Sequence, residues 1–321
     1  MVTVTSADEA PPRAGTLARA ARAPSGGTAA TAGGRLLTWV FLAPSLLVFA
    51  VFVFYPLGRT GYLSLHGNDI FGRPADFVGP RHYLDLLTSP DFRRTLLTTA
   101  LFTAYTVVPG VLGALLLVLL LESRIRGVRL FRTAFALPFA FSVASASVVF
   151  SVIYNPAIGV ANGLLGRFGV APLGWLTDPS LALPAVSAAS VWMVLGYNVL
   201  VLSAGIGAIP PEVVEAARLD GASGLRLARS ITVPLLGPHL FFLVVVSTIQ
   251  ALQSFGQIHI LTRGGPNRAT TTLVYSIYDR AFANNASDFG VASAQAVVLL
   301  VVVLACAAVQ FGVLERKVFY R

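Results

Sequence analysis

The chain has 321 residues, of which 55% are apolar and only 12% are charged, and its mean hydropathy is +0.76. A soluble domain usually carries about 25% charged residues, so this composition excludes an ordinary soluble protein and indicates a polytopic membrane protein. The net charge of +9 does not indicate nucleic-acid binding, because the basic residues stand at the ends of apolar segments and form no single patch.

The first 34 residues differ in composition from the rest. Residues 1–34 are rich in Ala, Gly, Pro, Ser and Thr, and such a segment cannot bury a core. We therefore expect a disordered cytoplasmic tail over residues 1–34 and a transmembrane domain over residues 35–321. The tail does not resemble a secretory signal, because the apolar segment that follows it is too long.

Six charge-free apolar intervals predict six transmembrane helices. A helix needs about 20 apolar residues to cross the hydrocarbon, and each interval is long enough. The expected spans are Leu36–Gly58, Thr95–Leu121, residues 133–154, and segments within Pro179–Pro211, Ser230–Thr262 and Phe289–Leu314. The runs are continuous and show no alternation of apolar and polar residues, so we predict an all-α fold rather than a β-barrel.

The distribution of Lys and Arg predicts the orientation. Most of the 23 basic residues fall in the tail, in the second-to-third and fourth-to-fifth connections, and at the C-terminus. Connections rich in Lys and Arg face the cytoplasm. Both termini and the fourth-to-fifth connection are therefore expected to be cytoplasmic.

The sequence contains no visible catalytic or energy-coupling site. It lacks a phosphate-binding loop, its four His residues are scattered without metal-ligand spacing, and its single Cys306 excludes a disulfide. No Asp, Glu, Lys or Arg stands at the centre of a span, where ion-coupled carriers usually place one. We therefore expect no enzyme activity, metal or cofactor, and uphill transport would need a partner as its energy source.

The fourth-to-fifth connection, residues 210–230, is a polar stretch between two apolar spans. Pro210 and Pro211 end one span and favour a new helix start, and Glu212 suits its first turn. Val213–Leu219 is expected to form two helical turns, which Gly221 ends. On spacing alone, this segment fits a docking helix and a solvated connector equally well.

The residues of this connection resemble the signature loop of the permease subunits of ATP-binding-cassette (ABC) importers. The matching residues are Glu215, Ala216, Ala217, Asp220, Gly221, Ile231 and Pro234, and Val233 stands where Leu is more usual. The resemblance implies the type I importer permease fold. It also implies that the loop is a coupling helix, which docks in a groove of a cytoplasmic ATPase. Gly196-Tyr197-Asn198 and Gly264-Gly265-Pro266 also fall where carbohydrate importers of the maltose-permease type have them.

Within this family, the chain is most similar to the first permease subunit of glycerol-3-phosphate importers, through Asp69–Gly72 and Ala269–Tyr275. This implies import of glycerol-3-phosphate, a glycerophosphodiester or a related polyol or sugar. Import of disaccharides or oligosaccharides is the alternative, and a self-sufficient secondary carrier is a more distant one. The implied partners are a second, homologous permease, two ATP-binding subunits that use ATP and Mg, and an extracytoplasmic solute-binding protein. The implied location is a bacterial cell membrane.

Polar residues in two of the expected spans suggest the solute path. Ser247, Gln250, Ser254 and Gln257 recur at helical spacing in the fifth span, and Tyr197 and Asn198 lie in the fourth. Tyr197, Ser247, Gln250 and Ser254 match positions that contact substrate in the maltose-type family. Gln250 replaces an aromatic residue there, which argues against a stacked sugar ring. The same polar residues also fit interhelical hydrogen bonds, and both interpretations stay open.

Overall fold

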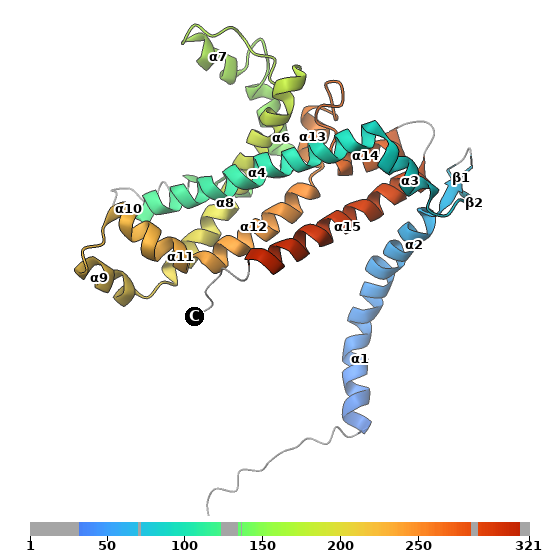
Figure 1. The fold of residues 1–321 in the computed structure, drawn as a ribbon, viewed down its shortest axis with the longest axis horizontal. Coiled ribbons are helices and arrows are strands. Elements are labelled where there is room, and N and C mark those ends of the chain that lie inside the picture. Colours follow the sequence, from blue (N-terminus) through green and yellow to red (C-terminus); the bar gives the residue numbers. More distant parts are fainter. Residues whose placement is uncertain (1–31, 70–71, 123–133, 136, 284–287, 315–321) are drawn as a thin grey trace, which may run out of the picture. The chain divides into compact units, whose positions relative to one another are not determined.

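The computed structural model describes residues 32–69, 72–122, 134–135, 137–283 and 288–314, which are mostly helical (Figure 1). The chain divides into two units, Met1–Pro56 and Leu57–Arg321. The predicted tail lies outside the described residues except for its last three, 32–34, which begin the first helix.

The first unit is helical wherever it is described. It consists of α1 (Ala32–Phe49) and η1 (Ala50–Phe54), and α2 (Tyr55–Leu63) continues the chain into the second unit. Thr38–Leu63 is 26 residues long and apolar enough to cross a membrane, close to the predicted span Leu36–Gly58. Every side chain from Thr38 to Phe54 is exposed, so this segment presents apolar surface on all sides.

A short antiparallel ribbon corrects the all-α prediction. Strands β1 (His66–Asn68) and β2 (Pro74–Phe77) pair with His66 opposite Phe77 and Asn68 opposite Pro74. Gly72, at φ +74°, helps the chain turn between them, and the side chain of Asp69 accepts a hydrogen bond from the Arg73 N–H at 2.7 Å. Helix α3 (Arg81–Thr88) follows.

Four long helices form the body of the second unit (Figure 1). They are α4 (Pro90–Glu122), α8 (Pro179–Gly207), α12 (Gly237–Leu252) and α15 (Phe289–Leu314). Helix α4 packs along α8 and α12, and α12 also packs against α15. Fully buried side chains from three of these helices, Phe102, Leu202 and Leu243, form the centre of the core.

The start of α8 is fixed by its capping residue. Asp178 accepts hydrogen bonds from the Ser180 amide at 2.8 Å and the Ser180 hydroxyl at 2.6 Å, and Pro179 takes the first helical position. These hydrogen bonds hold the pKa of the Asp178 carboxyl below its ordinary value. The helix therefore begins where the apolar interval of the sequence begins.

The third predicted span is not found as one helix in the described part of the chain. Leu137–Ala140 forms the 3-10 turn η2, and Ser142 caps α6 (Val143–Ile153) by accepting from the Ser145 N–H at 3.1 Å. Helix α6 has 11 residues and is therefore about 16 Å long, half the thickness of the hydrocarbon. Pro138 explains the break, because it lacks an N–H and restricts the preceding residue. Helix α7 (Val160–Gly166) follows in the next connection.

The fifth predicted span is bent. Helix α10 (Gly224–Leu227), η3 (Ala228–Thr232) and α11 (Val233–Leu235) form one arm, which meets α12 at 67°. Pro234 and Pro238 flank the bend at Leu236, and each removes a backbone donor. Among the described residues, four helices are long and apolar enough to cross a membrane, or five if this bent pair counts as one span. The predicted number of six is not confirmed.

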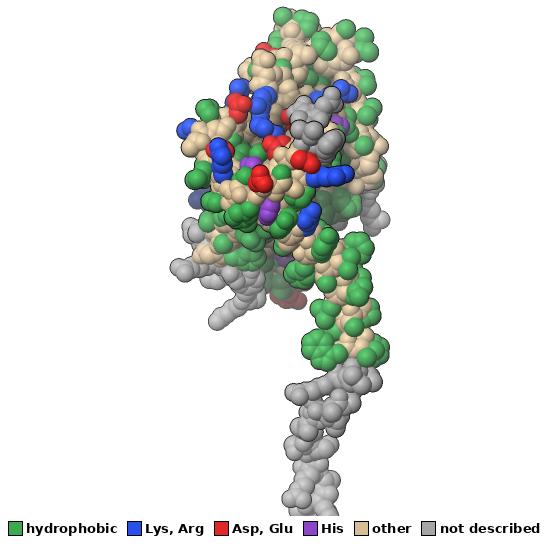
Figure 2. All heavy atoms as spheres, turned by 90° about the vertical axis from the view of Figure 1, so that its right-hand side faces the viewer, with side chains coloured by type: hydrophobic (Ala, Val, Ile, Leu, Met, Phe, Trp, Pro, Cys, Tyr) green, Lys and Arg blue, Asp and Glu red, His purple; other side chains and the backbone are tan. Residues whose placement is uncertain are grey.

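Charged side chains gather at the ends of the bundle. Figure 2 shows Arg and Asp side chains on the end where the ribbon and α3 lie, which we call the ribbon end. At the opposite end lies α9 (Pro211–Leu219), and we call this the α9 end (Figure 1). Short helices α13 (Gly256–Leu261) and α14 (Leu273–Tyr278), and the π-helical turn η4 (Asp279–Ala283), complete the described elements.

The contact between α8 and the bend before α12 depends on a glycine. A Cβ at Gly205 would lie 2.8 Å from both His239 Cγ and Leu236 Cδ2, whereas a Cβ at Gly207 would meet nothing within 4 Å. We expect Gly205→Val to lower the free energy of unfolding by about 1–3 kcal/mol through overpacking. Gly207→Val is the matched control in the same helix. Thermal unfolding of the purified protein would measure both, and equal stability of the two variants would contradict the prediction.

Candidate functional site

The loop at the α9 end has a defined local structure. Pro211 takes the first helical position of α9 and Glu212 lies in its first turn, as predicted. The helix ends in a Schellman motif: the Ala222 N–H donates to the Ala217 carbonyl at 2.9 Å, and the Gly221 N–H donates to the Arg218 carbonyl at 3.0 Å. Gly221 has φ +82°, a conformation that disfavours residues with a Cβ.

The predicted coupling residues lie on both sides of this turn. Glu215, Ala216, Asp220 and Gly221 are exposed, so small and acidic residues form the outer surface of α9 and its C-terminal turn. Ala217 is buried. The two remaining predicted residues lie in the arm that leads to α12, Ile231 half-buried and Pro234 exposed. Leu219 is 89% exposed, so the loop also presents an apolar side chain at its surface.

The four predicted polar residues of the fifth span line one cavity of about 410 Å³. The prediction treated them as one continuous helical stripe, but α12 ends at Leu252 and Gln257 belongs to α13. They nevertheless converge, because the chain turns at Gln253–Phe255 and α13 packs against α6 and α8. The other lining residues are Thr106, Val143, Ser190, Met193, Val194, Ala251, Gln253, Phe255 and Gly256.

Hydrogen bonds fix part of the cavity wall. The Gln257 amide donates to the Ser190 hydroxyl of α8 at 3.3 Å and also contacts the Ser254 hydroxyl. Gln257 and Ser247 are buried, whereas Gln250 and Gln253 are exposed. The Gln257 hydrogen bond ties α13 to α8. A solute contact of the other polar residues stays a prediction.

No charged residue lines the cavity, and its polar side chains stand among apolar ones. None of its lining residues is Asp, Glu, Lys or Arg, and its polar groups are hydroxyls and carboxamides. Phe255 supplies one aromatic ring, which also stacks on His259 with 5.1 Å between ring centroids. Sequence reasoning missed Phe255, Gln253 and Ser190, because the helix break that brings them together is not visible in the apolar pattern. Carboxamides and hydroxyls suit a hydroxylated solute.

The two predicted residues of the fourth span do not line this cavity. Tyr197 is half-buried and its ring packs near Phe139, with centroids 5.8 Å apart. Asn198 is 1% exposed and lies one turn beyond Val194, toward the α9 end. A Cβ at Gly110 of α4 would lie only 3.6 Å from its Nδ2. Neither polar atom of the Asn198 amide has a hydrogen-bond partner among the residues that the structure describes.

Within the ranges that the structure describes, no group of three His, Cys, Asp or Glu side chains is placed to hold a metal ion.

These features define a class of protein. Apolar helices, several of membrane-spanning length, line an uncharged cavity that carries hydroxyl and carboxamide groups, and a structured helical loop lies at one end. This is the organisation of a polytopic membrane permease.

The family follows from comparison with known proteins. Residues 92–320 match the family described as binding-protein-dependent transport system inner membrane component, and the chain belongs to this family. It is 36% identical over 289 residues to the sn-glycerol-3-phosphate transport system permease protein UgpA of Agrobacterium fabrum, and 38% identical to UgpA of Brucella abortus. Both alignments cover 89% of this chain and 97% of the relative.

Solved structures show the same fold. A chain of a bacterial ABC transporter that imports the acidic polysaccharide alginate matches with a TM-score of 0.76 at 23% identity, covering 88% of this chain and 96% of its own. A chain of the alginate transporter in complex with a pentasaccharide-bound periplasmic protein matches with a TM-score of 0.77 at 22% identity, covering 88% and 94%. The fold is that of ABC importer permeases.

The unpaired amide of Asn198 leads to a prediction about stability. A buried polar group without a partner costs roughly 1–3 kcal/mol, so Asn198→Ala should leave the free energy of unfolding unchanged or raise it by about 1 kcal/mol. Val199→Ala is the control, because Val199 is fully buried in the apolar core and its truncation should cost about 2 kcal/mol. Thermal unfolding would compare them. A loss with Asn198→Ala as large as with Val199→Ala would show that the amide is hydrogen-bonded.

Proposed function

We propose that this chain is one of two permease subunits of an ABC importer that takes up glycerol-3-phosphate, a glycerophosphodiester or a related polyol. The observation that carries the proposal is its similarity to two UgpA relatives over 97% of their length. The exposed Glu215-Ala216 surface at the α9 end supports it, because an importer permease without an energy source of its own needs a site for an ATPase.

In this proposal the α9 end faces the cytoplasm of a bacterial cell and the ribbon end faces outward. Arg218, Arg226 and Arg229 lie at the α9 end, and the positive-inside rule favours a cytoplasmic location for them. Both termini are then cytoplasmic. The proposed membrane is the bacterial cell membrane.

The proposed partner at the α9 end is an ATP-binding subunit, of which the complex would contain two. Helix α9 docks in a groove of that subunit, and the Schellman turn at Gly221 sets its direction relative to α10. The partner subunits bind ATP and Mg and carry out hydrolysis. This chain binds no cofactor and catalyses no reaction. It converts movement of α9 into movement of the bent helix pair that follows it in sequence.

The proposed solute path runs through the cavity lined by Ser247, Gln250, Ser254 and Gln257. A second, homologous permease completes its wall, and an extracytoplasmic solute-binding protein delivers solute at the ribbon end. Gln250 and Gln253 meet the solute, whereas Gln257 positions Ser254 against α8. Asn198 and Tyr197 lie below, on the way to the α9 end.

A second candidate substrate is a disaccharide or oligosaccharide. The cavity wall contains an aromatic ring, Phe255, and its lining residues include no Lys or Arg that would pair with a phosphate. The ring of Phe255 can stack on a sugar ring, a contact that Gln250 cannot make. The absence of Asp, Glu, Lys and Arg from the cavity wall argues against a self-sufficient secondary carrier.

Reconstitution tests the proposed function. The complex, purified with its partner subunits and solute-binding protein, should take up labelled glycerol-3-phosphate into ATP-loaded proteoliposomes and should not take up maltose. Uptake of maltose alone would favour the second candidate. Uptake without any ATP-binding subunit would overturn the importer proposal.

The turn at Gly221 provides a test of coupling. A non-glycine residue at a positive φ costs about 1–2 kcal/mol, and a β-branched residue costs more. We expect Gly221→Val to uncouple ATP hydrolysis from uptake, lowering uptake per ATP about tenfold. Gly221→Asn is the matched control, because Asn tolerates this conformation, and it should keep most of the activity. Paired measurements of ATPase rate and uptake would decide, and normal coupling in the Val variant would refute the role.

The cavity provides a test of solute contact. Gln250→Leu should raise the KM for uptake about threefold to tenfold, because it removes one carboxamide from the wall, and complex assembly should be unaffected. Gln310→Leu is the control: this amide donates to Thr248 Oγ1 at 2.9 Å, between α15 and α12, and does not line the cavity. The control should lower thermal stability without changing KM. Unchanged uptake kinetics in the Gln250 variant would assign Gln250 to packing.

A further inference from the structure

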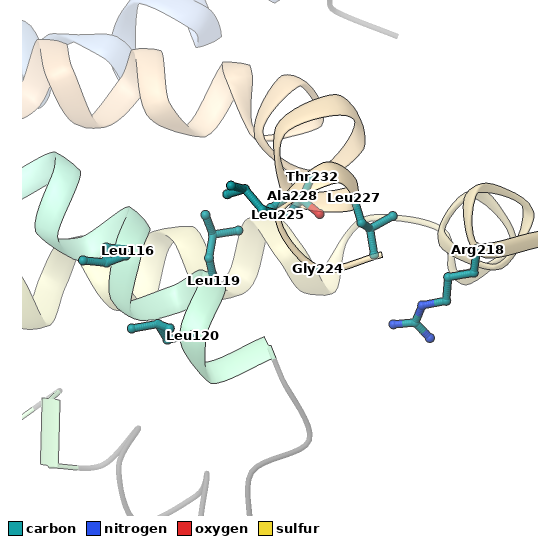
Figure 3. A pocket seen from close by; sticks show the side chains of 9 residues that line it. All are labelled: Leu116, Leu119, Leu120, Arg218, Gly224, Leu225, Leu227, Ala228 and Thr232. Atoms are coloured by element: carbon teal, nitrogen blue, oxygen red, sulfur yellow. The ribbon is translucent and has the colours of Figure 1, made fainter. Parts of the chain in front are cut away.

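A second cavity, of about 390 Å³, lies between the end of α4 and the loop that carries α9 (Figure 3). Its walls come from the last turns of α4 and from the arm made by α10 and η3, and they are mostly leucine: Leu116, Leu119, Leu120, Leu225 and Leu227. Arg218 of α9 is the one charged residue among those that line it. This combination differs from the hydroxyl and carboxamide wall of the first cavity.

The apolar wall continues along α4. Large apolar side chains on this helix are exposed at a spacing of three or four residues, and together they form one face: Leu97, Leu101, Tyr105, Val108, Leu112, Leu116 and Leu120. The last two members of this face, 60% and 54% exposed, also line the cavity. A hydrocarbon chain lying along α4 would therefore pass into the cavity without leaving apolar surface.

Arg218 supplies a cation where the apolar face ends. Its side chain is exposed, and among the described residues it has no salt-bridge partner. In Figure 3 the guanidinium extends from α9 across open space, with the leucine side chains of α4 and α10 on the other side of the cavity. A guanidinium binds phosphate oxygens through its fork of N–H donors.

The size of the cavity limits what can occupy it. A helix about 10 Å across would fill 390 Å³ with roughly one turn, so the cavity is too small for a partner helix. An acyl chain is narrower and matches the leucine walls. A free phosphate would match Arg218 but leave the apolar walls without a ligand.

We propose that this cavity binds an anionic phospholipid, with one acyl chain against Leu116, Leu119 and Leu227 and the phosphate at Arg218. This site lies in the inner leaflet if the α9 end faces the cytoplasm, so its location rests on the proposed function. Because Arg218 belongs to α9 and Leu116 belongs to α4, the bound lipid joins the loop proposed to receive the ATP-binding subunit to the body of the permease.

Lipid retention tests the proposal. The complete complex, delipidated in detergent and titrated with phosphatidylglycerol or phosphatidylcholine, would be analysed by native mass spectrometry. We expect preferential retention of phosphatidylglycerol, which Arg218→Gln lowers by up to about fivefold, the upper end of the range for one exposed ion pair. Arg226→Gln is the matched control, because Arg226 is an exposed arginine of α10 that does not line the cavity. A second variant, Ala228→Phe, fills the cavity and should lower retention of both lipids.

Several results would overturn the lipid site. Equal retention of both lipids by the wild type, or equal losses in the Arg218 and Arg226 variants, would show that no specific headgroup site exists. Displacement by inorganic phosphate would identify a free-anion site, and loss of the ATP-binding subunits from the Arg218→Gln complex would make Arg218 a protein contact. The assay uses neither ATP nor solute, so its result does not depend on whether the complex imports glycerol-3-phosphate.

Discussion

The structure depends on one constraint: a polar group inside a bilayer must find a partner within the protein or a cavity that holds one. Most of the polar side chains described between the two ends of the bundle satisfy it. Threonines of α4 donate to backbone carbonyls one turn earlier, as Thr99 does to Thr95 at 2.7 Å, and Gln310 of α15 donates to Thr248 of α12. Several of the remaining amides and hydroxyls line one cavity. Others are buried without a partner among the described residues, including the Ser187 hydroxyl and both polar atoms of the Asn198 amide.

The same constraint explains why the loop at the α9 end is built as it is. A connection at the membrane surface can use charge and backbone irregularity that the interior cannot. Helix α9 is short, it ends at a glycine with a positive φ, and the arm that follows meets α12 at a bend flanked by two prolines. At the glycine and at the bend, the chain changes direction within a few residues. The bent arm connects α9 in sequence to α12, which carries Ser247 and Gln250 of the cavity wall.

The sequence predicts those parts of the fold that apolar length alone decides. The charge-free intervals locate α4, α8 and α15, and Gly221 and Pro211 locate the two ends of α9. The sequence mispredicts a helix where a proline, a capping residue or a turn interrupts an apolar interval. Pro138 and the Ser142 cap shorten the third interval to an 11-residue helix, and the turn at Gln253–Phe255 divides the fifth. The four polar residues of the stripe line one cavity although the helix assumed for them is interrupted, because the turn keeps them on one wall. Phe255 is missed for the same reason.

An uncharged path has a consequence for transport. A site that pairs a phosphate with buried arginines would bind it tightly and release it slowly, whereas carboxamides and hydroxyls form weaker, neutral hydrogen bonds. A permease gains nothing from tight binding, because the solute must leave the cavity on the other side in every cycle. Strong recognition can then reside in the solute-binding protein proposed as partner. The neutral wall around Gln250 and Gln253 is therefore compatible with an anionic solute as well as with a sugar.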